Sequence, residues 1–180
     1  MNSKFALKLG AILTALSLVK ILYSYFINSP YEKDYSMVVN IIATIIFLAA
    51  EVVILVLAFR NYKKINIENR KLLTIGNGLK ISTIAYLIQA LIGNLTNALI
   101  YASSDELMQK AINQIKVQYA KTQLSPEQVK VAMEYAIFML KPKMIFISGF
   151  IGTLIGGLVL SLIILAFVRE KETISNIKTE

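Results

Sequence analysis

The stretch MIFISGFIGTLIGGLVLSLIILAFV, residues 144–168, runs for 25 residues without a charged side chain. As an α-helix it would be roughly 37 Å long, enough to cross a hydrocarbon core of about 30 Å with some tilt. A helix of this length on the surface of a soluble protein would carry a polar face, and this stretch carries none. It therefore predicts a membrane-spanning helix, from which the rest of the chain can be interpreted.

Three further apolar stretches accompany it. Residues 81–103 also lack charge, residues 5–27 carry only Lys8 and Lys20, and residues 37–59 carry only Glu51. We expect an all-α integral membrane protein with four transmembrane helices, residues 1–180 forming a single membrane domain. The less favoured alternative is a soluble bundle of four fully buried helices.

The first of these stretches could also be a secretory signal peptide. Its apolar part is too long for one, and no small-x-small cleavage site follows it. We expect an uncleaved membrane anchor.

An extramembrane helical hairpin is predicted between the third and fourth spans, over about residues 104–141. Ser125 is suited to cap a helix, Pro126 to open it, and Gln128 to complete a capping box. Ser104 can cap a preceding helix in the same way. The alternative is a pair of helices lying in the membrane interface, which the mixed charge of the segment disfavours.

The distribution of basic residues predicts the orientation. Residues 60–80 contain one acid, Glu68, and six bases: Arg60, Lys63, Lys64, Arg70, Lys71 and Lys80. By the positive-inside rule this segment and both termini face the cytoplasm, and residues 104–143 lie outside. The outer segment carries six lysines of its own, Lys143 among them, but four acids offset them.

The net charge of +8 lies beside the spans, so it favours a lipid partner over nucleic acid. The bases of residues 60–80 could bind anionic headgroups, at about 1 kcal/mol each. Alternatively, they form a solvated loop that only sets the topology. A protein partner or a second copy of the chain is also possible.

Several kinds of chemistry are excluded by composition. The chain has no cysteine and no histidine, which excludes disulfides, thiolate or imidazole metal sites and the corresponding catalysis. It also lacks G-x-S-x-G, H-E-x-x-H and phosphate-loop motifs. We expect no catalytic residues, no cofactor, no metal and no enzymatic activity.

Four polar residues are predicted inside the membrane. Glu51 and Gln89 fall at similar height and could hydrogen-bond, whereas Lys20 and Asn94 lie nearer the outer surface. Lys20 and Glu51 are expected to be too far apart for a tight pair. These residues could form an ion or proton relay. Interhelical packing, with Lys20 extending towards the surface, is favoured because no second carboxylate lies at a matching depth.

Two stripes of small residues mark the last span. One consists of Gly149, Thr153, Gly157 and Ser161, and the other of Ser148, Gly152 and Gly156. Small residues four apart let another helix approach closely. We expect packing against the third or first span, with a second copy of the chain as the alternative.

Three short motifs stand at defined places among the four spans: TIGNGLK (residues 74–80), SPEQ (125–128) and KPK (141–143). With this layout the chain resembles a bacterial family described as domain of unknown function 4199. The resemblance implies a small, uncharacterised multi-pass protein of the bacterial inner membrane. In that membrane, the outer segment predicted from the basic residues would be periplasmic. The resemblance implies no active site.

Two functions remain. The favoured hypothesis is a non-enzymatic interaction or accessory subunit of the bacterial envelope, with the hairpin as its contact surface. The alternative is a small transporter or ion or proton channel that uses Glu51 and the polar residues near it. No proline interrupts a span and no internal repeat is visible, which disfavours a carrier with unwound helices.

Overall fold

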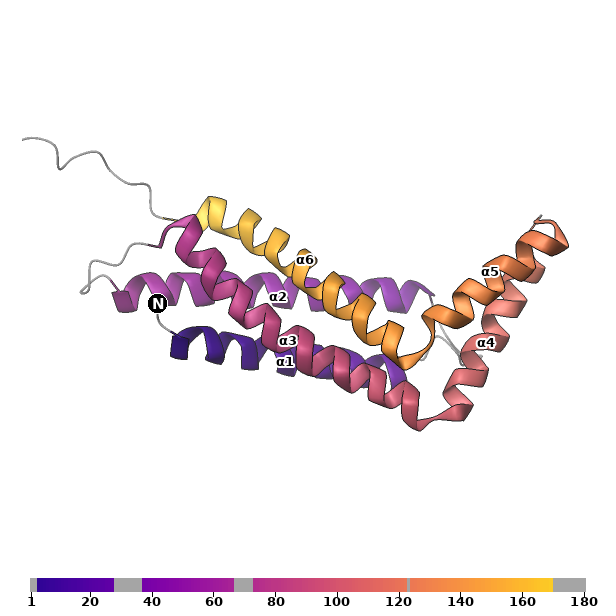
Figure 1. Cartoon of the computed structure of the whole chain (residues 1–180). Helices are drawn as coiled ribbons and strands as arrows, with labels where there is room; N and C mark the ends of the chain where they lie inside the picture. The colour runs from indigo at the N-terminus through magenta and orange to yellow at the C-terminus, as the bar shows by residue number, and fades with distance from the viewer. Residues whose placement is uncertain (1–2, 28–36, 67–72, 123, 170–180) are drawn as a thin grey trace, which may run out of the picture.

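A computed structural model describes residues 3–27, 37–66, 73–122 and 124–169. Four long helices form a bundle: α1 (Ser3–Phe26), α2 (Met37–Asn66), α3 (Ile75–Ser103) and α6 (Pro142–Val168). Two shorter helices, α4 (Asp105–Ala120) and α5 (Pro126–Met139), project from one end as a hairpin (Figure 1). The start of α1 and the end of α6 lie at the opposite end. We call these the hairpin end and the terminal end.

All four bundle helices are long and apolar enough to span a membrane. Their outward faces carry large exposed hydrophobic side chains, including Leu22, Ile45, Leu57 and Ile155. A soluble protein rarely exposes so much continuous apolar surface, whereas lipid solvates it. The predicted fold class is therefore confirmed: the chain is an all-α, multi-pass membrane protein with a helical hairpin between its third and fourth spans.

Helix α3 is the centre of the bundle. It packs extensively against α1 on one side and α6 on the other, whereas α2 makes fewer contacts, with α1 and α6. Glycines lie at the close approaches: Gly10 of α1 faces the backbone of Ala85, and Gly78 of α3 faces the side chain of Leu165. Helices can approach this closely in lipid only where no side chain intervenes.

The apolar core occupies the terminal half of the bundle. Leu13 of α1, Phe59 of α2, Ile81 of α3 and Leu165 of α6 are all at most 1% exposed. The ring of Tyr62 adds an edge-on contact with Phe5. Because this half is filled by side chains, the polar space described below is closed towards the terminal end.

The segment between the second and third spans differs from expectation. Helix α2 continues to Asn66, and α3 already begins at Ile75, where the hydroxyl of Thr74 accepts a bond from the backbone N–H of Asn77 at 3.2 Å. Gly76 and Gly78 are thus helical, although they precede the apolar stretch of residues 81–103. The first link, residues 28–36, and residues 67–72, with Glu68, Arg70 and Lys71, lie outside the described residues.

The hairpin has the expected caps. The hydroxyl of Ser125 accepts from the N–H of Gln128 at 3.3 Å, and the side chain of Gln128 accepts from the N–H of Ser125 at 3.0 Å. The hydroxyl of Ser104 caps α4 in the same manner. Helix α5 buries none of its residues, and α4 buries only Ala111. The hairpin therefore has almost no core of its own.

Candidate functional site

Two adjoining cavities lie beside the apolar core, the first at mid-height of the bundle and the second nearer the hairpin end. The first has a volume of about 480 Å³ and lies between all four bundle helices. The second, of about 350 Å³, continues between α1, α3 and α6 towards the hairpin end. Ser17, Lys20 and Thr153 line both cavities. We call the two cavities together the chamber.

Glu51 enters the first cavity from α2. One of its carboxylate oxygens accepts a hydrogen bond from the hydroxyl of Tyr86 on α3 at 2.7 Å. Tyr86 is 1% exposed, and its ring lies against Gly157 of α6. A charged side chain at this depth costs about 3 kcal/mol on insertion scales, and a single neutral donor offsets only part of that cost.

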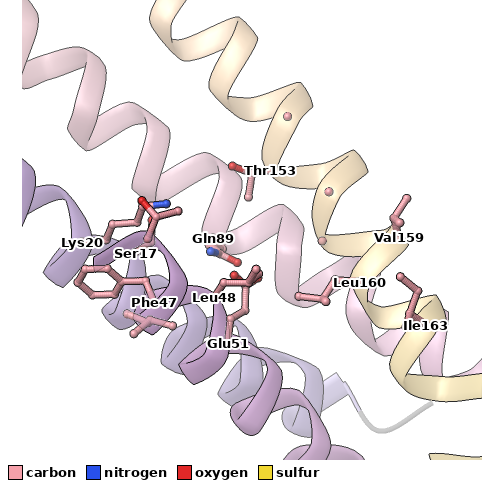
Figure 2. A pocket seen from close by; sticks show the side chains of 15 residues that line it. Ser17, Lys20, Phe47, Leu48, Glu51, Gln89, Thr153, Val159, Leu160 and Ile163 are labelled. Atoms are coloured by element: carbon pink, nitrogen blue, oxygen red, sulfur yellow. The ribbon is translucent and has the colours of Figure 1, made fainter. Parts of the chain in front are cut away.

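Gln89 points into the same space from α3. Both residues line the first cavity, and Figure 2 shows the side chains of Gln89 and Glu51 extending towards each other from α3 and α2. Gln89 is 9% exposed, and its amide oxygen has no hydrogen-bond partner. The sequence allowed a hydrogen bond between Glu51 and Gln89; in the structure the donor to Glu51 is Tyr86, one turn earlier on the same face of α3.

Lys20 of α1 lies where the two cavities meet. Within the described part of the chain it forms no ion pair, with Glu51 or with another carboxylate. The two opposite charges therefore border one chamber without contacting each other, in agreement with the heights expected from the sequence.

Asn94 joins α3 to α6. Its amide nitrogen donates to the hydroxyl of Thr153 at 3.1 Å and to the backbone carbonyl of Ala90 at 2.9 Å. Its amide oxygen lies directly against Gly149. Asn94 thus acts in helix packing, and it also lines the second cavity.

The two stripes of small residues on α6 have different environments. Gly149 and Gly157 are covered by Asn94 and Tyr86 of α3, and Ser161 is fully buried. The first stripe therefore packs against the third span. Gly152 and Gly156 of the second stripe have no atom near the position of a Cβ, and both line the first cavity. Ser148, at the start of that stripe, is exposed.

The second cavity has a polar wall near the hairpin end. The hydroxyl of Tyr25 donates to the side-chain oxygen of Asn97 at 2.9 Å, and its ring packs edge-on against Tyr101 at 5.8 Å between centroids. Ser24 also lines this cavity. The chamber is thus increasingly polar from Glu51 towards the hairpin end.

The donors and acceptors of the chamber suit an organic ligand better than a metal. Glu51 is the one carboxylate among its lining residues, and no group of three or more acidic residues is gathered anywhere in the described segments. Divalent cations usually require several oxygen ligands. A volume of about 480 Å³ with a few converging polar groups is typical of small-molecule sites.

Sequence reasoning identified Lys20, Glu51 and Gln89 but missed Tyr86 and Ser17. Tyr86 lies three residues before Gln89, so a shared helical face was a usable signal. Ser17 carried no such signal, since isolated serines are common in membrane helices. Its position becomes informative only when α1 is placed against Gly93 of α3.

A family model described as "Protein of unknown function (DUF4199)" matches residues 4–170 of the chain. No curated protein and no solved structure matches the chain.

Proposed function

Because the chain belongs to the DUF4199 family of unknown function, we propose from its geometry that it is a non-enzymatic interaction subunit whose hairpin docks onto a partner protein. The observation that supports this proposal is the exposed apolar surface of the hairpin. Val131 and Tyr135 of α5 are 67% and 65% exposed, and Val117 of α4 is 55% exposed. Outside a membrane, such a patch is typical of a protein–protein contact.

The apolar side chains gather along a shallow groove at the tip of the hairpin. The groove is lined by Tyr119, Leu124, Glu127, Gln128, Val131, Ala132 and Tyr135. Glu127 is its one charged residue, and aromatic and aliphatic side chains form most of it. This composition is typical of the buried centre of a protein–protein interface and not of a surface that stays in contact with water. The proposed partner therefore presents an apolar ridge.

We propose that the protein lies in a bacterial inner membrane, with the terminal end cytoplasmic and the hairpin periplasmic. Support comes from the bases at the terminal end, where Lys4, Lys8 and Lys64 are exposed. Cytoplasmic flanks of membrane helices are rich in lysine and arginine, and anionic headgroups would add about 1 kcal/mol per base.

Photo-crosslinking in native membranes tests the docking role. A crosslinking amino acid at Val131 should give one discrete adduct with a different protein, and the same group at the exposed Lys130 should not. The variant Val131→Ser should weaken the association at least tenfold, whereas Lys130→Ser should leave it unchanged.

Three outcomes would speak against this role. Adducts with lipid would place the hairpin in the membrane interface. Adducts with the same chain would make the groove a dimer contact. Equal labelling from positions 130 and 131 would mean that the groove has no defined partner.

The chamber favours a second candidate function, a small transporter or channel using Glu51. Its support is the polar space that runs from Glu51 towards the hairpin end. The protein in liposomes should then carry a solute or ion, and Glu51→Gln should abolish the flux. Absence of flux from the native protein would end this reading and leave the docking role untouched.

A further inference from the structure

The chamber contains hydrogen-bond acceptors that lack donors, and a lysine that lacks a carboxylate partner. We propose that the chamber binds a small zwitterion with an apolar body. Its ammonium group lies at Glu51 and Gln89, and its acidic group lies at Lys20. This inference goes beyond the docking role of the hairpin and does not depend on it. It also holds whether or not the ligand is carried across the membrane.

The end of the chamber near Glu51 needs hydrogen-bond donors. The Glu51 carboxylate accepts one bond, from Tyr86, and the neighbouring amide oxygen of Gln89 accepts none although Gln89 is 9% exposed. Buried acceptors of this kind are nearly always satisfied in proteins. An ammonium group has three donors and a positive charge, so one such group can satisfy both acceptors and neutralise the carboxylate.

Lys20, where the two cavities meet, can bind an anion. Its side chain is exposed, lines both cavities and has no carboxylate partner among the residues that the structure describes. From the helical rise per residue and the thickness of the hydrocarbon core, we expect Lys20 and Glu51 to lie roughly 8 Å apart along the membrane normal. The flexible lysine stem covers much of that distance. One small molecule can therefore bridge the two charges, which line the same cavity and form no ion pair with each other.

The walls between these ends suit an apolar body. Leu16, Phe47 and Leu160 line the first cavity, and Gly152 and Gly156 leave open space on the α6 side. The apolar core closes the chamber towards the terminal end. A ligand of amino-acid size with an aliphatic or aromatic side chain fits this shape. A bare ion would leave most of a cavity of about 480 Å³ unfilled.

The first arm of the test varies the ligand and leaves the protein intact. Binding to the purified full chain is measured for L-leucine, for 3-methylbutylamine, which has only the ammonium group, and for 4-methylpentanoate, which has only the carboxylate. Leucine should bind at least about tenfold more tightly than either analogue, because each analogue loses one charge-assisted contact.

The second arm varies the protein. Glu51→Gln should weaken the binding of leucine and of the amine by about tenfold and leave the binding of the acid unchanged. Lys20→Met should weaken the binding of the acid and leave that of the amine unchanged. Gln89→Leu should weaken leucine and the amine. Thr96→Val is the matched control and should change nothing, since Thr96 is on α3, lies outside both cavities and bonds only to the backbone of its own helix.

A phospholipid headgroup with an ammonium group offers the same chemistry from the bilayer. Thermal stabilisation in nanodiscs of phosphatidylethanolamine but not phosphatidylcholine, lost in both Glu51→Gln and Lys20→Met, would identify that source. The proposal is overturned if leucine, tested to about 10 mM, binds the native chain no better than the amine and phosphatidylethanolamine gives no stabilisation that the two substitutions remove. The comparison of ligands uses only the native protein, so it tests the proposal even if a variant does not fold.

Discussion

At the scale of single residues, the chamber depends on how Glu51 is accommodated inside the bundle. The carboxylate accepts a hydrogen bond from the hydroxyl of Tyr86, a buried residue of α3. Tyr86 in turn lies against Gly157, so its ring position is fixed by the packing of α6. One side chain thus connects helix packing to the electrostatics of the chamber.

Tyr86→Phe removes the hydroxyl and keeps the ring. Glu51 then loses its donor, and we expect the free energy of unfolding to fall by about 0.6–2 kcal/mol. Unfolding in mixed micelles of a mild detergent and dodecyl sulfate measures it. In a double-mutant cycle with Glu51→Leu, which removes the acceptor, the two changes should be non-additive, because either one alone abolishes the same hydrogen bond. Strictly additive effects would show that the bond contributes nothing.

At the scale of elements, the contact between α3 and α6 depends on which side of α6 is covered. Gly149 and Gly157 face α3, whereas Gly152 and Gly156 face open space, and Gly156 is the immediate neighbour of Gly157. Adjacent glycines therefore have opposite roles. This difference provides a matched pair of substitutions on one helix.

Gly157→Ala places a methyl group against the Tyr86 ring, so we expect a loss of about 1–3 kcal/mol in the free energy of unfolding. Gly156→Ala meets no atom within 4 Å and should be neutral or slightly stabilising. Both are measured in the same mixed-micelle assay. Equal effects of the two variants would contradict the described contact of α6 with α3.

At the scale of the whole molecule, the terminal end and the hairpin lie at opposite ends of the bundle (Figure 1). In a bilayer, that arrangement puts the start of α3 and the hairpin in different compartments. The chain has no native cysteine, so single thiols can report the compartment. Gly76 at the start of α3 and Gln118 of α4 are both exposed.

We expect an impermeant maleimide added to intact bacterial cells with a permeable outer membrane to label Gln118→Cys but not Gly76→Cys. Gly76 tolerates the change, because a Cβ there meets nothing within 4 Å. Labelling of Gly76→Cys alone would invert the proposed orientation. Labelling of both from one side would contradict four spans.

The fold class could be predicted from the sequence alone. Residues 144–168 have no polar face, and a chain of this kind is stable only if lipid covers it. The hairpin was equally predictable, since the Ser125–Gln128 capping box is a local pattern that forms regardless of the rest of the chain. These features depend on neighbours in sequence and on the solvent.

The site was only partly predictable, because it depends on how far apart the helices lie and how they are rotated. The sequence placed Glu51 and Gln89 at one height, yet only the tertiary structure showed that Tyr86 takes the carboxylate and leaves the Gln89 oxygen without a donor. The same holds for α6, where rotation alone determines that one stripe of small residues packs on α3 and the other opens into the chamber. Periodicity determines which residues share a face of one helix, but contacts between helices determine what each face meets.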